Sequence, residues 1–304
     1  MQIYLPIAEI SIDVFLLFLM GGGVGFLSGI FGVGGGFLMT PLLIFIGIPP
    51  AVAVATQSNN IIASSVSGVL AHMQRGNVDF LMGGILTLGG FLGSFLGVLL
   101  FKLLRELGQI DLVINLSYVI LLGTLGILMS VEGIRAVTKQ SRPGGPRKKL
   151  HEHHWFHGLP LRMRFRKSRL YISALLPFGI GAMIGVLSAI MGVGGGFVLV
   201  PAMIYVLGMP TAVVIGTSLF QVIFVAINIT ILQSIETQTV DVVLAMILLL
   251  GSVIGAQIGT RAGAGLRAEW LRLLLGLLVL SVCIKLFLDL LIPPADIYSL
   301  EVLG

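Results

Sequence analysis

The side chains best suited to chemistry are neutral polar groups that stand inside long apolar stretches. They are Thr56, Gln57, Ser58, Asn59 and Asn60 in one half of the chain and Thr217, Ser218 and Gln221 in the other. An unpaired amide in apolar surroundings costs several kcal/mol, so such groups face either a helix interface or a ligand. Hydrogen bonding between helices is the plainer explanation, worth about 0.6 kcal/mol per bond. Five consecutive polar residues favour a role in ligand binding.

A glycine-rich motif, GVGGGF, occurs at 32–37 and again at 192–197. It lacks the third glycine of a dinucleotide-binding motif, so we do not expect a nucleotide. Contiguous glycines allow a helix to break inside a membrane, where the freed backbone groups must face protein or water. A short helix that starts after the break directs free N–H groups and a positive dipole end at its surroundings, which favours an anion. The glycines expected to bind the anion through their backbone are Gly34, Gly35, Gly36, Gly194, Gly195 and Gly196.

Glycines spaced four residues apart form a second pattern. They are Gly21, Gly25 and Gly29, Gly89, Gly93 and Gly97, Gly181 and Gly185, and Gly251, Gly255 and Gly259. Small residues at this spacing let two helices approach closely, so we expect packing faces here and not ligand sites.

The elements that must position these groups are membrane-spanning helices. The chain has 304 residues, of which 57% are hydrophobic and 10% charged, whereas soluble domains carry about 25% charged residues. Apolar stretches near the 20 residues needed to cross a bilayer fall at 12–31, 50–72, 80–101, 112–131, 171–191, 211–233, 241–261 and 271–292. Two shorter stretches fall at 37–47 and 197–208. The sequence therefore predicts an all-α polytopic membrane protein.

The two halves of the chain are copies of each other. Residues 24–41 and 184–201 are identical at 11 of 18 positions, and the offset stays between 160 and 162 further along. We expect an N-terminal repeat (1–134), a linker (135–170) and a C-terminal repeat (171–304), each repeat having four full spans and one short broken half-helix. If the short segments cross, the repeats are inverted and most basic residues face the cytoplasm. If they turn back, each half has four passages, and the charge distribution fits less well.

Eleven of the eighteen Lys and Arg residues lie in the linker region. The positive-inside rule places it in the cytoplasm, where it suits contact with anionic lipids. No nucleic-acid-binding fold surrounds it, so nucleic acid is not an expected partner. Its histidine cluster, HEHHWFH at 151–157, has no carboxylate or thiolate framework to fix a metal. A homodimer is left open.

The sequence contains nothing that indicates an enzyme. No Asp, Glu, Lys or Arg stands in the middle of a predicted span, and no nucleophile–base pair is visible. The lone Cys283 cannot form an intrachain disulfide. We therefore expect no catalytic residues, no metal site and no cofactor.

The duplicated GVGGGF motif, the run from Thr56 to Asn60 and the basic central linker resemble the TauE/SafE family of sulfite and organosulfonate exporters. The resemblance covers roughly 12–131 and 171–292. It implies a secondary transporter or facilitator that exports small sulfur-containing anions across the bacterial inner membrane, which we expect to work by alternating access. An anion channel or a membrane sensor of the same fold is the alternative.

Overall fold

The computed structural model describes residues 2–31, 36–138, 161–165, 167–168, 170–263 and 268–291. Residues 139–160 of the predicted linker, and Gly34 and Gly35 of the first glycine motif, lie outside these ranges. The first half contains β1 (Gln2–Leu5), β2 (Ile10–Asp13), α1 (Val14–Phe31), α2 (Gly36–Phe45), α3 (Pro50–Gln74), α4 (Phe80–Glu106) and α5 (Ile110–Thr138). The second contains β3 (Arg162–Phe165), β4 (Leu170–Ser173), α6 (Leu175–Met191), α7 (Gly196–Tyr205), α8 (Thr211–Glu236), α9 (Val242–Gly263) and α10 (Ala268–Leu291).

Most of the described residues are helical, and many of the helices are strongly apolar. Within the described ranges, five segments, in α4, α5, α8, α9 and α10, are long and apolar enough to cross a membrane. Helix α3 is also long, with 25 residues, but it carries the polar run. Large apolar side chains point away from the protein, such as Leu88 and Leu96 on α4, which are 61% and 51% exposed. A multi-pass membrane protein explains such an outer surface, because lipid covers it.

Two short β-hairpins correct the all-α prediction. Strands β1 and β2 pair antiparallel, as do β3 and β4. Strands β2 and β4 take up the first residues of the spans expected at 12–31 and 171–191, so the helices begin later, at Val14 and Leu175. The apolar residues of these strands run directly into the helices, and short apolar runs do not distinguish strand from helix by periodicity.

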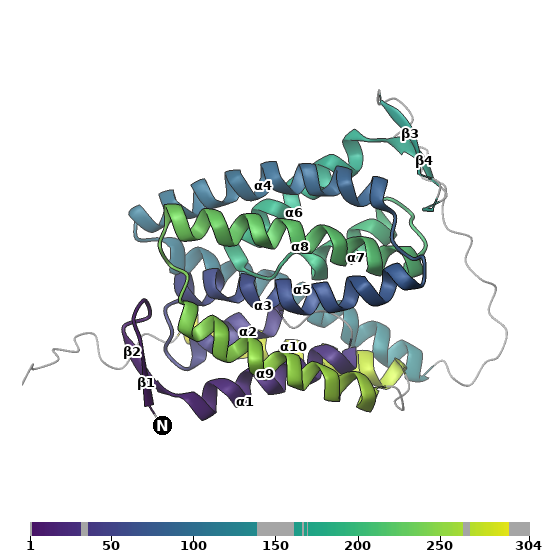
Figure 1. The fold of residues 1–304 in the computed structure, drawn as a ribbon. Helices are drawn as coiled ribbons and strands as arrows, with labels where there is room; N and C mark the ends of the chain where they lie inside the picture. Colours follow the sequence, from purple (N-terminus) through teal and green to yellow (C-terminus); the bar gives the residue numbers. More distant parts are fainter. Residues whose placement is uncertain are drawn as a thin grey trace, which may run out of the picture.

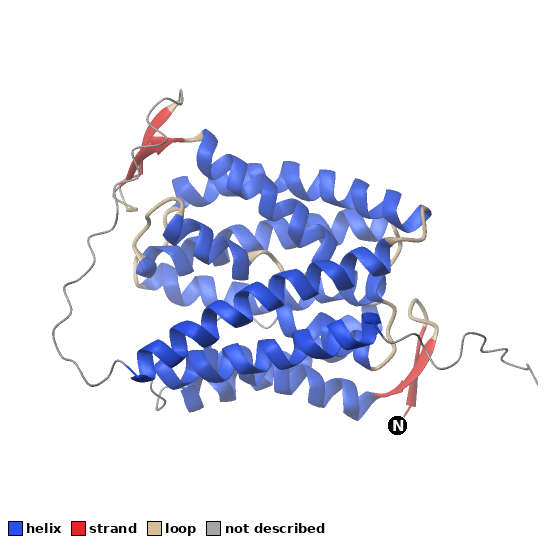
Figure 2. Cartoon of the chain, turned by 180° about the vertical axis from the view of Figure 1, so that it is seen from behind, coloured by secondary structure: helices blue, strands red, loops and turns tan. Residues whose placement is uncertain are grey.

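The helices of the two halves are exchanged in space. The first helix of each half packs along the fourth helix of the other, so that α1 lies on α9 and α6 lies on α4. Helix α3 packs on α8, and α5 packs on α10. The hairpins that precede α1 and α6 lie at opposite ends of the bundle (Figures 1 and 2). Equivalent helices therefore start from opposite ends.

Most of the spaced glycines lie where the exchanged helices touch, as expected for packing faces, although Gly25 also lines the pocket described below. A Cβ atom added to Gly93 of α4 would lie 1.9 Å from the carbonyl oxygen of Ala182 in α6. One added to Gly255 of α9 would lie 2.0 Å from the carbonyl oxygen of Gly22 in α1. Neither distance is sterically allowed, so a residue with a side chain would push the helices apart.

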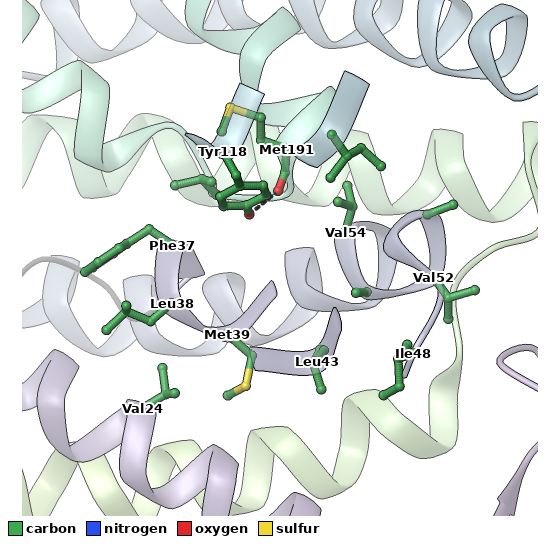
Figure 3. Packing of buried hydrophobic residues seen from close by; sticks show 14 of the residues in the cluster. Val24, Phe37, Leu38, Met39, Leu43, Ile48, Val52, Val54, Tyr118 and Met191 are labelled. Carbon is green, nitrogen blue, oxygen red and sulfur yellow. Dashed lines mark hydrogen bonds between the residues drawn. The ribbon is translucent and has the colours of Figure 1, made fainter. Parts of the chain in front are cut away.

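A buried apolar cluster surrounds α2 (Figure 3). Phe37, Leu38, Met39 and Leu43 of this short helix are all at least 98% buried. At the edge of the cluster, the hydroxyl of Tyr118 donates to the carbonyl oxygen of Met191 at 2.5 Å. Met191 is the last residue of α6, so this bond joins α5 of the first half to the helix break of the second.

Candidate functional site

The second glycine motif breaks the chain sharply between α6 and α7. Gly192, Gly194 and Gly195 all have positive φ angles, of 67°, 73° and 70°, a conformation that residues with a Cβ atom rarely adopt. A Cβ on Gly194 would also lie 2.6 Å from the Cγ2 atom of Ile61. The chain needs glycine here both for its backbone geometry and for space.

The two breaks come together in the interior. A Cβ on Gly36, the first residue of α2, would lie 2.6 Å from the Cδ1 atom of Ile61 and 3.0 Å from the carbonyl oxygen of Val193. The rings of Phe37 and Phe197, the second residues of α2 and α7, stack with centroids 4.5 Å apart. The N-termini of both short helices are thus neighbours in the middle of the bundle.

A small pocket opens at the N-terminus of α2. Its volume is about 10 Å³, room for about one water molecule. It is lined by residues of α1, α2, α3 and α9, namely Val24, Gly25, Ser28, Gly36, Gln57, Asn60, Ser64, Ser252 and Ala256. Of the predicted site residues, the pocket gathers Gly36, Gln57 and Asn60.

Three serines in the pocket wall were not predicted. Ser28 and its counterpart Ser188 precede the two glycine motifs at equivalent positions, a repeated signal that could have identified Ser28. Ser252 stands in the apolar α9 and Ser64 stands beside Ser65 in α3, and both hydroxyls bond to carbonyl oxygens of their own helix. They are brought to the pocket by the packing of α3 and α9.

The pocket wall combines apolar surface with neutral polar groups. The hydroxyl of Ser252 donates to the Oδ1 atom of Asn60, which leaves the Asn60 amide NH₂ group for another partner. Gln57 is 99% buried, and its Oε1 atom has no hydrogen-bond partner within the described residues. The first turn of α2 adds backbone N–H groups that have no carbonyl acceptor within their own helix. Such an arrangement can bind an anion without a charged side chain.

The predicted threonines lie outside the pocket. The hydroxyl of Thr56 accepts a hydrogen bond from the backbone N–H of Asp241 at 3.0 Å, and that of Thr217 accepts from Asp79 at 3.0 Å. Both bonds cross between the halves. Ser58 is buried and Asn59 partly buried, and neither lines the pocket.

The predicted polar residues of the second half form a separate group. Gln221 is fully buried, and its amide nitrogen lies 2.8 Å from where a Cβ on Gly90 of α4 would stand. The Ser218 hydroxyl donates to the carbonyl oxygen of Ile215 in its own helix at 2.9 Å. Asn60, by contrast, contacts α9. The structure therefore does not bring the predicted polar residues of the two halves into one site.

Metal ligands do not gather in the described part of the chain. No group of three or more His, Cys, Asp or Glu side chains comes together there. The histidine cluster at 151–157 lies outside the described residues.

The sequence model of the family described as "Sulfite exporter TauE/SafE" matches residues 17–286. The chain belongs to the TauE/SafE family. A probable membrane transporter protein of Xylella fastidiosa (strain 9a5c) is 31% identical over 268 residues, covering 87% of this chain and 91% of that protein. The probable membrane transporter protein YjnA of Bacillus subtilis (strain 168) is 28% identical over 273 residues, covering 89% and 98%.

A shorter match links the chain to plant members of the family. Sulfite exporter TauE/SafE family protein 5 of Arabidopsis thaliana is 34% identical over 91 residues, covering 30% of this chain and 20% of that protein. No solved structure matches the chain. TauE/SafE membership agrees with the apolar helices, and the relatives are named as transporters and not as enzymes.

Proposed function

We propose that this TauE/SafE protein is a secondary transporter that exports small sulfur-containing anions, such as sulfite or an organosulfonate, across the bacterial inner membrane. The observation that carries the proposal is the pocket with neutral polar groups at the N-terminus of α2. The family description and the printed names of the relatives support the transport class.

The pocket supports an anion as the substrate. The α2 N-terminus presents a positive dipole end, equivalent to roughly half a charge, and free N–H groups. The side-chain amides of Asn60 and Gln57 would add donors to the oxygens of a sulfur oxyanion. No lining residue is ionisable, so the site would bind and release an anion without neutralising a fixed counter-charge.

The arrangement of the halves supports alternating access by two inverted repeats. Equivalent helices start from opposite ends of the bundle (Figure 1), and the first helix of each half packs against the other half. Residues 1–134 and 171–304 would each provide four spans and one short half-helix. Rocking of α1 with α9 against α6 with α4 would expose the site to one side at a time.

The topology that we propose puts both termini outside and the linker (135–170) in the cytoplasm. Arg164 on β3 and nearby Lys167, both within the linker region, are exposed. Contact of this region with anionic lipids follows from its basic composition, at about 1 kcal/mol per basic residue near the surface.

The proposal is tested by measuring flux of radiolabelled sulfite in proteoliposomes, with thiosulfate, sulfate and a sulfonate as competitors. Saturable flux that falls with Asn60→Leu is expected, because this change keeps the volume and removes the amide. Asn115→Leu on α5, outside the pocket, is the matched control and should leave flux unchanged. Flux that does not saturate would favour an anion channel. The absence of flux for every anion would contradict transport and favour a sensor.

A further inference from the structure

Each residue that lines the pocket has a counterpart in the second half, and three of the nine pairs are identical. With offsets of 160 to 162, Ser28 corresponds to Ser188, Gly36 to Gly196, and Asn60 to Gln221. These counterparts lie on α6, α7 and α8, and the helix that corresponds to α9 is α4.

The two polar side chains of this second group are buried without partners. Gln221 is 0% exposed, and neither its Oε1 nor its Nε2 atom has a hydrogen-bond partner among the described residues. Ser188 is 2% exposed, and its Oγ atom also has no partner among them. Buried polar groups are nearly always paired, so unpaired ones mark a strained or functional position.

Ser188 lies at the start of α7, and Gln221 lies where α8 meets α4. A Cβ on Gly195, the residue that caps α7, would lie 3.8 Å from the Cβ atom of Ser188. The amide of Gln221 lies against Gly90, and a Cβ on Gly185 would lie 2.5 Å from the Gly90 carbonyl oxygen. Gln221 therefore lies where α8 meets α4 and α6, and Ser188 lies where α6 meets the N-terminus of α7. An amide, a serine hydroxyl and a short-helix N-terminus also line the first pocket.

Several lining residues differ between the repeats, and one of these differences fills space in the second group. Where the first half has Ser64, the second has Val225. A Cβ on Gly90 would lie 2.4 Å from the Cγ2 atom of Val225, so this side chain fills the space beside Gln221. Helices α4 and α8 would have to separate for the group to open.

We propose that Ser188, Gln221 and the N-terminus of α7 form a second anion subsite, which is closed in this conformation. This subsite binds the same sulfur oxyanion as the open pocket. The identity of the anion rests on the proposed function. Because the repeats start from opposite ends, the two subsites open toward opposite sides of the membrane. Ile61 lies beside both Gly36 and Gly194, so the anion passes this side chain when it moves from one subsite to the other.

Two buried glutamines on α8 provide a matched test. Gln221→Met removes an amide that has no partner, so the protein should unfold at the same temperature or higher. Sulfite flux should fall about tenfold or more, as expected for losing a buried hydrogen bond to a charged group. Gln233 instead donates to the carbonyl oxygen of Ala189 at 3.1 Å. Gln233→Met should lower the unfolding temperature and leave flux per folded molecule unchanged.

A normal flux in Gln221→Met, with flux lost in Asn60→Leu, would overturn the second subsite and leave the proposed function standing. Lower unfolding temperatures in both glutamine variants, with normal flux in both, would likewise make Gln221 structural and overturn it.

A second measurement does not depend on transport. Ser28→Cys and Ser188→Cys are each made in a Cys283→Ala background and treated in vesicles with a membrane-impermeant methanethiosulfonate that carries a sulfonate group. Cysteine at 28 and cysteine at 188 should react from opposite sides of the membrane. If the cysteine at 188 resists the reagent from both sides while that at 28 reacts, the subsite does not open and the inference fails, whether or not sulfite is transported.

Discussion

The backbone N–H of Asp79 donates to the hydroxyl of Thr217 at 3.0 Å, across 138 positions of sequence. Its repeat counterpart is the bond from Asp241 to Thr56, also 3.0 Å long. Asp79 directly precedes α4 and bonds to Thr217 on α8, whereas Asp241 directly precedes α9 and bonds to Thr56 on α3. Both threonines are buried and belong to the other half of the chain. The two bonds join the halves at equivalent points beside the helices that carry the candidate site.

Each aspartate also holds a hairpin. The Oδ1 atom of Asp79 accepts from the N–H of Met82 and caps α4, while its Oδ2 atom accepts from both the N–H and the hydroxyl of Ser168, between β3 and β4. Asp241 caps α9 in the same way, and its Oδ2 atom accepts from the N–H of Ile7, between β1 and β2. A single carboxylate at each end therefore connects a hairpin, a helix start and the opposite half.

Replacing Thr217 by Val should destabilise the protein, because the N–H of Asp79 remains buried without an acceptor. The expected loss is about 1 to 3 kcal/mol, measured by denaturant titration of the purified protein in mixed micelles. Thr217→Ser keeps the hydroxyl and should recover most of the stability. Equal stability of the Val and Ser variants would show that this bond contributes nothing.

Asp79→Asn should loosen the β3–β4 hairpin without removing the cap of α4. Asparagine caps helices as well as aspartate, but its NH₂ group cannot accept a hydrogen bond from the N–H of Ser168. Amide hydrogen exchange should therefore rise at residues 161–165 and 170–173 and stay unchanged at 2–13. Asp241→Asn is the reciprocal control and should raise exchange only in the β1–β2 hairpin. Changes in both hairpins from either variant would mean that the carboxylates act globally.

Gly93→Ala should separate α4 from α6, because the added Cβ would lie 1.9 Å from a backbone oxygen that cannot move alone. We expect a lower unfolding temperature and a lower folded yield. Gly84 of the same helix has no atom within 4 Å of an added Cβ. Gly84→Ala should therefore be neutral or stabilise by up to about 1 kcal/mol through helix propensity. A similar loss in both variants would contradict the packing explanation.

Transport should follow the membrane potential and not a proton gradient. One charge that crosses 100 mV gains about 2.3 kcal/mol, so export of an anion from a negative interior needs no coupled ion. No pocket residue can carry a proton at neutral pH. Sulfite flux measured under a clamped potential should rise with interior negative voltage and change little when a pH gradient is imposed. Flux that follows the pH gradient and ignores voltage would indicate proton coupling.

Much of the architecture could be predicted from local sequence. Apolar stretches of about 20 residues identify helices because lipid requires every backbone group to be bonded internally. The doubled GVGGGF motif located both helix breaks to within a residue or two, since contiguous glycines have few other uses in an apolar chain. The spaced glycines, such as Gly93 and Gly255, were correctly assigned to helix contacts for the same local reason.

The partners of each group were decided only by tertiary structure. Thr56 and Gln57 are adjacent in sequence, yet Thr56 holds Asp241 and Gln57 lines the pocket, because consecutive helical residues point in different directions. Ser252 reaches Asn60 only because α9 of one half lies against α1 and α3 of the other. The sequence alone determined that the chain forms two related sets of apolar helices with glycine breaks. Which polar groups meet, and which of the two clusters is open, depended on contacts between residues far apart in the chain, which no local pattern encodes.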